Sequence, residues 1–268
     1  MTIQFKNPPL LELIAELRWQ VPFGDFPVMQ PGLPFQVQVG PVADDPAVER
    51  LRKLCEGMGF VYVERLVPMG AGVMPGQAVY RFRRPDDEVV VQAGPGVLTV
   101  HALPPYSSWS AFSPEVKKVV EALLSTRDAG QAQFFDTVSV RYLDAFGARF
   151  LGTESPSHFA QHVLGYDIVV PPAVETVRAK NGTTSLSFSY GFATEDGLQG
   201  QIALSEAIVN NENSLMLDTN VRASAPVRPY GEALMDVFDR AHDVIHSIFI
   251  DATKSVQHIM EPVGGPDV

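Results

Sequence analysis

The sequence predicts an α+β protein built from two tandem, related halves that each combine antiparallel strands with helices. Residues 11–19 and 138–146 both alternate apolar and polar side chains, which is the period of a strand with one face on a core. Leu17-Arg18-Trp19 in the first segment aligns with Val140-Arg141-Tyr142 in the second. Each segment is followed by a helix, several strands with hairpin signals and a closing helix, so we expect one plan used twice.

The first half begins with Asn7-Pro8-Pro9, which keeps the chain extended because proline disfavours helix in the residue before it. Residues 21–40 are rich in Pro, Gly and Phe, and they predict a long loop of the kind that is usually functional or mobile. Asp44-Asp45-Pro46 caps a helix whose apolar residues recur at helical spacing. These residues are Val48, Leu51, Leu54, Cys55 and Met58.

Four strands and a second helix complete this half. We expect the strands at residues 60–67, 78–83, 88–92 and 97–103. Turn residues between them, such as Gly94-Pro95-Gly96, predict an antiparallel meander. Ser113-Pro114-Glu115 then predicts the start of a helix with an apolar stripe. The stripe is formed by Val116, Val119, Val120, Leu123 and Leu124.

The second half follows the same order with variations. After the strand, Ser155-Pro156 predicts a short helix that ends at Leu164, and the Pro/Val stretch 168–174 predicts an extended edge. The turn Thr194-Glu195-Asp196-Gly197 predicts a hairpin. Its strands are expected at residues 184–192 and 198–207, followed by a turn at 210–213, a strand at 214–222, a long helix at 228–260 and a disordered tail at 262–268.

This order of elements resembles the TATA-binding-protein-like or helix-grip architecture, repeated in tandem. A curved antiparallel sheet with helices on one face satisfies it, because such a sheet covers one apolar face and leaves the other wet. The halves are expected at residues 1–131 and 132–261. The likeness is a fold analogy, and it assigns no function by itself.

The charge balance disfavours nucleic acid as a partner. The 268-residue chain has a net charge of −11, with 12 basic and 14 acidic residues up to Gln131 and 8 and 17 after it. Phosphate backbones repel such a field. Arg81, Arg83 and Arg84 could form a local basic patch, although a solvated hairpin edge is the favoured interpretation.

The composition also indicates a cytoplasmic protein. Cys55 is the only cysteine, so no internal disulfide forms, and its place in a helical stripe favours a small core residue. The first residues lack the basic and apolar regions of a signal peptide. No apolar run is long enough to span a bilayer, so we expect no membrane association. We also expect no cofactor.

Three segments together resemble a sporadically distributed bacterial family of similar length and no established activity. They are Lys6-Asn7-Pro8-Pro9-Leu10 running into Glu12 and Glu16-Leu17-Arg18, then Val140-Arg141-Tyr142-Leu143, and finally residues 241–249 (Ala241-His242 to Ser247-Ile248-Phe249) with Ile250-Asp251. The family has Ile-Asn where this chain has Leu143-Asp144, and leucine before the histidine where this chain has Ala241. The resemblance implies no catalytic residues, and sporadic occurrence implies an accessory role in mobile genetic or defence contexts.

Two constellations are candidates for chemistry. His242 and His246 lie one helical turn apart and could share a metal, although Asp243 stands where a metalloprotease has glutamate and two half-buried histidines are the favoured reading. Arg18 and Arg141 occupy equivalent places in the two halves. They could bind an acidic ligand or partner, or form sheet-face salt bridges to Glu16 and Asp144 or others, which is the favoured alternative.

Taken together, these features favour a non-enzymatic protein-binding or assembly module of a bacterial accessory system, acting as a homodimer through a broad sheet surface. The expected contact residues are Arg18, Trp19, Arg141 and Tyr142, with apolar anchors at Phe23, Phe26 and Phe35. One alternative is a small-molecule binder or enzyme with a pocket between sheet and helices. The other is nucleic-acid binding by the sheet face, which the acidity disfavours.

Overall fold

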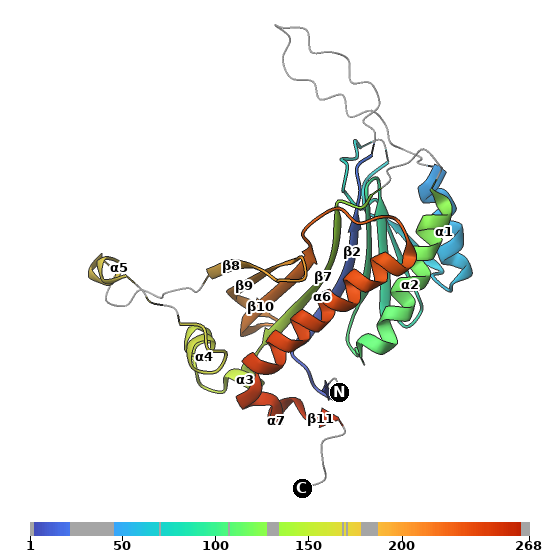
Figure 1. Cartoon of the computed structure of the whole chain (residues 1–268). Helices are drawn as coiled ribbons and strands as arrows, with labels where there is room; N and C mark the ends of the chain where they lie inside the picture. The colour runs from blue at the N-terminus through green and yellow to red at the C-terminus, as the bar shows by residue number, and fades with distance from the viewer. Residues whose placement is uncertain are drawn as a thin grey trace, which may run out of the picture. The chain divides into compact units, whose positions relative to one another are not determined.

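The computed structural model describes residues 3–21, 46–69, 71–106, 108–127, 134–167, 169, 171–177 and 187–263. Within them the chain is an α+β protein, as predicted, with a large antiparallel sheet (Figure 1). The strand order of this nine-stranded sheet is β3-β4-β5-β6-β2-β7-β10-β9-β8. A separate pair joins β1 (Gln4–Phe5) to β11 (Pro262–Val263).

The chain forms two compact units that interleave along the sequence. The β3–β6 unit comprises residues 13–140 and 222–241, and the β8–β10 unit comprises residues 1–12, 141–221 and 242–268. The strand β2 (Leu10–Arg18), the strand β7 (Thr137–Phe146) and the helix α6 (Gly231–Ala252) contribute residues to both units. The predicted halves are two continuous stretches of chain that meet at residue 131. The interleaved units do not test that division, and it stays a prediction.

In the β3–β6 unit, the expected meander is present. Each strand pairs antiparallel with the next, and β6 also pairs with β2. The strands are β3 (Tyr62–Arg65), β4 (Tyr80–Arg83), β5 (Val89–Gly94) and β6 (Val97–Ala102). In β2 the residues Leu13, Ala15 and Leu17 are buried, whereas Glu16 and Arg18 alternate with them on the opposite face. The pattern predicted for this strand is therefore confirmed.

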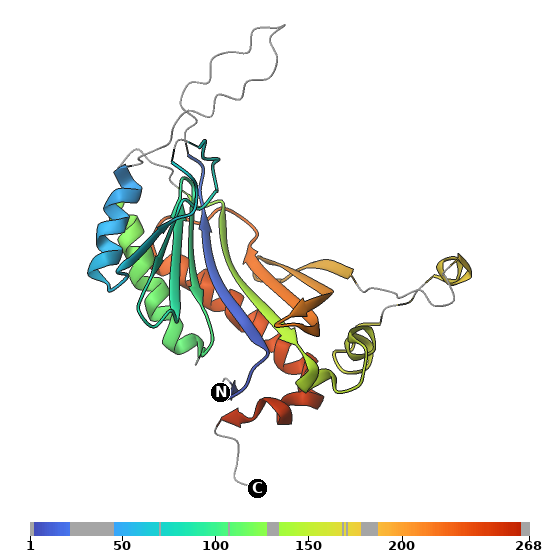
Figure 2. The same cartoon turned by 180° about the vertical axis from the view of Figure 1, so that it is seen from behind.

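Two helices complete this unit's core. The helices α1 (Pro46–Gly57) and α2 (Trp109–Thr126) pack against each other, and α2 contacts β6 (Figures 1 and 2). Their buried residues are Val48, Leu51 and Cys55 on α1, with Phe112, Val116, Val119, Val120 and Leu123 on α2. Burial also raises the pKa of the Cys55 thiol to about 12, so the cysteine is a core residue as expected.

In the β8–β10 unit, an apolar core lies between short helices, the sheet and the C-terminal end of α6. The remaining elements are α3 (Ala148–Leu151), α4 (Pro156–His162), α5 (Pro172–Val177), β8 (Ser187–Ala193), β9 (Leu198–Val209), β10 (Glu212–Ala223), η1 (Lys254–Val256) and α7 (Gln257–Met260). Phe146, Phe159 and Ile202 are fully buried in this core, and Phe192, Ile248 and Phe249 pack against it.

Two predicted helix boundaries are wrong. The helix expected to start at Ser113 begins four residues earlier, because the Ser108 side chain accepts a hydrogen bond from Ala111 N–H and caps α2. Pro114 consequently lies inside the helix. The long closing helix is interrupted at Thr253, whose hydroxyl donates to the Phe249 carbonyl before η1 and α7 begin.

Two segments expected to be irregular or extended are ordered differently. Residues 172–177 form α5 rather than an extended edge, and Thr176 donates to the Pro172 carbonyl within it. The expected disordered tail begins with Pro262 and Val263, which pair with Phe5 and Gln4. Such pairing links positions far apart in the sequence, and no local pattern reveals it. Residues 264–268 lie outside the described residues.

Among the described residues, none of the helices combines the length and the apolar character needed to cross a membrane.

Candidate functional site

The two arginines singled out in the sequence both form ion pairs with carboxylates, and the pair expected between Arg18 and Glu16 is present. Arg18 binds Glu16 on the same strand through two hydrogen bonds of 2.8 and 3.0 Å, and it also donates to the Gly76 carbonyl. Arg141 binds Asp218 of the neighbouring strand β10 at 2.8 and 2.5 Å. The expected pair of Arg141 with Asp144 is wrong, because residues 141 and 144 point to opposite faces of β7.

Trp19 lies in a packed aromatic contact. Its ring meets Phe135 edge to face at 5.7 Å between centroids. The Arg127 guanidinium lies over both rings, at 5.3 and 4.6 Å, and burial lowers the pKa of Arg127. Trp19 therefore has a structural role in its unit. The anchors predicted at Phe23, Phe26 and Phe35 lie outside the described residues.

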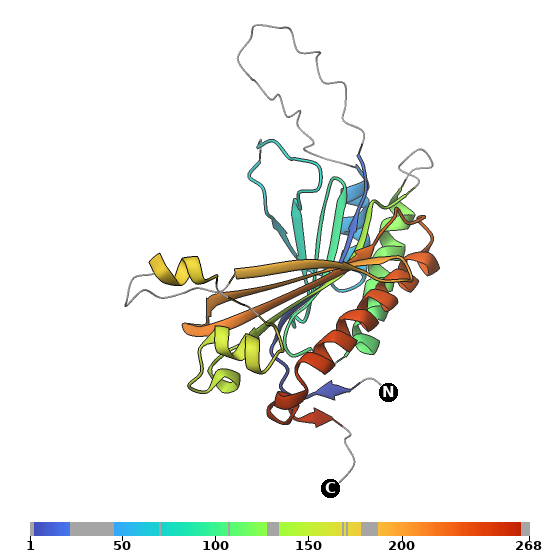
Figure 3. The same cartoon turned by 60° about the vertical axis from the view of Figure 1, so that its left-hand side comes forward.

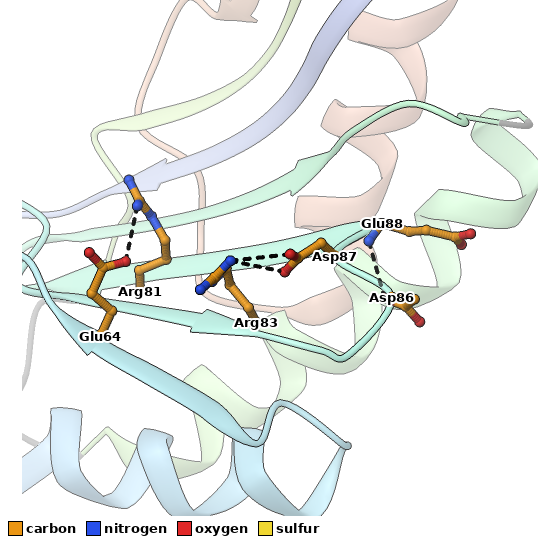
Figure 4. A network of polar contacts seen from close by, with 6 residues as sticks. All are labelled: Glu64, Arg81, Arg83, Asp86, Asp87 and Glu88. Carbon is orange, nitrogen blue, oxygen red and sulfur yellow. Dashed lines mark hydrogen bonds and ion pairs between the residues drawn. The ribbon is translucent and has the colours of Figure 1, made fainter.

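The arginines of the predicted hairpin edge are paired with carboxylates. Arg81 binds Glu64 and Arg83 binds Asp87, both at 3.1 Å (Figure 4). Arg84 binds Glu115 at 2.5 Å. Because each positive charge has an acidic neighbour, this edge presents little net positive potential, which favours a solvated, paired hairpin over a phosphate-binding patch.

Tyr142 and the two histidines, by contrast, come together. The Tyr142 hydroxyl and His242 Nδ1 are 2.8 Å apart, and the His242 and His246 rings stack at 5.6 Å. Burial, and then the neighbouring His246, lower the pKa of His242 to about 4, so this imidazole is neutral at pH 7. Burial also lowers the pKa of His246, with Asp243 acting in the opposite direction. The result is a neutral tyrosine–histidine pair at a core boundary.

Asp144 is a buried carboxyl that sequence reasoning assigned to a surface pair. It is 3% exposed and shares a face of β7 with Tyr142, two residues away. Burial raises its pKa to about 8, and within the described residues no hydrogen bond or cation offsets that effect. Asp144 is therefore largely protonated at pH 7.

Metal binding by His242 and His246 gains no support from this arrangement. Within the described ranges, no three His, Cys, Asp or Glu side chains come close enough together to hold a metal ion. A catalytic or stable structural zinc site requires at least three protein ligands.

An exposed row of aromatic side chains lies on the strand β8 of the β8–β10 unit. This strand is the last in the sheet order, so one of its two backbone edges has no strand beside it among the described residues. Figures 1 and 3 show β8 running beside β9. All of its residues except Phe192 are exposed, and none carries a charge at pH 7.

Three aromatic residues occupy one face of this strand. Phe188, Tyr190 and Phe192 alternate along β8, and their neighbouring ring centroids are 5.7 and 6.4 Å apart. Phe188 is 37% exposed and Tyr190 is 40% exposed, whereas Phe192 packs on the core. Tyr166 extends the row at 6.4 Å from Tyr190. We call Phe188, Tyr190, Phe192 and Tyr166 the aromatic row.

Gly200 allows the inner end of this row to lie close to β9. Gly200 is paired with Phe192, and a Cβ at this position would lie 2.0 Å from the Phe192 ring. Only glycine therefore leaves room for the ring over the backbone. The position of the Phe192 ring depends on this close approach.

The sequence predicted the strand β8 but not its place at the edge of the sheet. The alternating aromatics of Ser187-Phe188-Ser189-Tyr190-Gly191-Phe192 are visible in the sequence. Alternation predicts one apolar face, but it does not distinguish an edge strand from a central one.

Comparisons with protein-family models, with curated proteins and with solved structures found no match.

Proposed function

We propose that this chain is a non-enzymatic protein-binding or assembly module that binds its partner through the edge of its antiparallel sheet. The observation that supports this function most directly is β8, an uncharged edge strand with an exposed aromatic row. Arg18 and Arg141, which the sequence suggested as contact residues, form ion pairs within the chain. We therefore propose β8 as the binding surface instead.

The physical basis is strand addition. An edge strand presents unpaired amide and carbonyl groups, and an extended segment of another chain can satisfy them as one more strand. Natural sheets discourage such pairing with charges, prolines or bulges on the edge. Residues 187–193 contain no charge and no proline. Aromatic side chains bury a large apolar area and are enriched among the residues that dominate binding energy.

We also propose that the two halves are related, as the sequence suggests. In support, the first strand of each half lies beside the last strand of the same half, β2 beside β6 and β7 beside β10. Each first strand also has an arginine bound to a carboxylate, although the carboxylates come from different places. Membership in the sporadic bacterial family, and with it an accessory or defence-related setting, is part of the same proposal.

A photo-crosslinking experiment in the native cells tests the proposed binding function. A photoreactive phenylalanine analogue replaces Tyr190 in the full chain. Ile208, which is 76% exposed on β9, receives the same analogue in the control. We expect a discrete protein adduct from position 190 and a much weaker one from position 208. Absence of any protein adduct at position 190 would contradict the function.

Asp144 favours a second candidate, a small-molecule binder. A buried carboxyl with no hydrogen-bond donor among the described residues, two residues along β7 from Tyr142, fits a ligand with an amine or hydroxyl group. A thermal-shift screen of such compounds should give a stabilisation that Asp144→Asn abolishes and Asp218→Asn retains. Equal shifts in both variants, or none in the wild type, would reject this candidate.

A further inference from the structure

We infer that the partner of β8 is a second copy of this chain, paired antiparallel to it with the twofold axis at Tyr190. This inference rests on the proposed binding function and names its partner. The contact is isologous, because the same seven residues are contributed by both copies. Three properties of β8 support it, namely its outward amides, its symmetric side-chain pattern and its lack of charge.

The backbone has the correct groups on its open edge. Thr194 N–H donates to the Leu198 carbonyl where the hairpin closes, which places the hydrogen-bonded pairs of the β8–β9 ladder on even-numbered residues of β8. The amide and carbonyl groups of Ser187, Ser189, Gly191 and Ala193 therefore point away from β9. A twofold axis at Tyr190 pairs Ser189 with Gly191 and Ser187 with Ala193, which are the residues whose groups point outward.

The side chains match under the same axis. Tyr190 opposes Tyr190 of the second copy, and the position of Phe188 opposes that of Phe192, whose ring lies over Gly200 of its own β9. On the other face small residues oppose small residues, because Ser187, Ser189, Gly191 and Ala193 alternate with the aromatics. Tyr190 lies at a non-hydrogen-bonded pair, where opposing side chains come closest and cross-strand contacts are strongest.

Charge distinguishes a second copy from other partners. Each copy has a net charge of −11, so two copies repel each other at long range, whereas no charge within β8 opposes the local contact. Salt screens the repulsion. The dimer should consequently tighten as ionic strength rises. A basic partner segment attracted to the acidic chain would instead bind more weakly.

The test measures the molar mass of the purified full chain by light scattering and sedimentation across the micromolar range. We expect a dimer. Tyr190→Lys places two like charges opposite each other and should weaken dimerisation on the order of 100-fold. Ser189→Pro removes an outward N–H without touching the β8–β9 ladder, and it should also give monomers. Ile208→Lys and Ser189→Ala are the matched controls, and both should remain dimeric.

Circular dichroism melting confirms that each variant is folded, so a monomer reports lost pairing. If the wild type is a dimer and neither β8 variant dissociates it, the inference is overturned, because the two copies then associate through another surface. A wild-type monomer also overturns it. The crosslink at position 190 then decides the proposed function, which stands if a different protein is captured there and fails if none is. A dimer that weakens with added salt would likewise contradict pairing between two acidic copies.

Discussion

The two terminal strands of the nine-stranded sheet, β3 and β8, both expose apolar side chains but differ in charge. In β3, Glu64 binds Arg81 at 3.1 Å, and Arg65 donates to the Tyr80 hydroxyl at 2.7 Å. In β8 no residue is charged, and exposed aromatics alternate with small residues. An edge with fixed charges resists another strand, because pairing would desolvate them. Of these two edges, β8 is therefore the one that carries no charge to oppose a second strand.

The two units also differ in where the ionisable groups described above lie. In the β3–β6 unit, Arg18, Arg83 and Arg84 are bound to carboxylates at partly exposed positions. In the β8–β10 unit, Asp144 and His242 are ionisable groups held neutral by burial. Changes in pH and packing should therefore act most strongly on the β8–β10 unit.

The largest expected effect comes from Asp144→Asn. The pKa of Asp144 is about 8 in the folded chain and about 4 when unfolded, so the folded state binds the extra proton between those values. The free energy of unfolding of the wild type should therefore fall as pH rises from about 4 to about 8, at up to about 1.4 kcal/mol per pH unit. Asp144→Asn should remove that slope, as measured by urea titrations at several pH values.

Asp218→Asn is the control for this experiment, because Asp218 is a partly exposed carboxylate bound to Arg141. Asp218→Asn should change the free energy of unfolding by a similar amount at each pH and leave its dependence on pH as in the wild type. Parallel curves for the wild type and Asp144→Asn across this pH range would show that burial does not hold Asp144 protonated.

A smaller effect is expected from Gly200→Ala. The new Cβ would lie 2.0 Å from the Phe192 ring, so the ring must move, and overpacking of this kind costs about 1–3 kcal/mol. Phe192→Ala in the same chain should remove most of that cost, as a double-mutant cycle in urea measures. Gly191→Ala on β8 is the matched control, because its nearest neighbour would be an ordinary contact at 3.6 Å. Equal costs at positions 191 and 200 would contradict the close approach.

The smallest effect is expected at the β3 edge. Glu64→Gln removes the ion pair with Arg81, whose two side chains are 51% and 37% exposed. Such exposed pairs contribute less than about 1 kcal/mol, and salt reduces the contribution further. The thermal midpoint should change little and the molar mass not at all. A loss of several kcal/mol would mean that the β3 edge depends on its charges for folding as well as for protection.

Local patterns predicted much of the fold. Alternation identified β2 and β7, turn residues identified the hairpin that joins β8 to β9, and the apolar stripe of α6 contains Leu234, Phe238 and Ala241, which are fully buried. Helix caps and strand pairs between segments far apart in the chain were harder to predict from the sequence. Ser108 caps α2 ahead of the expected start, and Pro262 pairs with Phe5, because both depend on side-chain geometry or contacts between distant segments.

The candidate site was predicted only in part. The sequence nominated Tyr142, His242 and His246, and the structure brings these three together. The sequence offered Asp144, or another carboxylate, as the partner of Arg141, and β10 supplies Asp218. Where the partner lies on a neighbouring strand, as for Arg141, one sequence does not specify which strand that is.

By itself, the sequence determined that this is an α+β chain whose strands have one apolar face, because side-chain periodicity follows from backbone geometry and the need to bury apolar surface. Only the tertiary structure decided which strand lies at the edge of the sheet and which carboxyl is buried with no partner among the described residues. Both properties depend on strand order, and strand order is set by contacts between residues far apart in the chain.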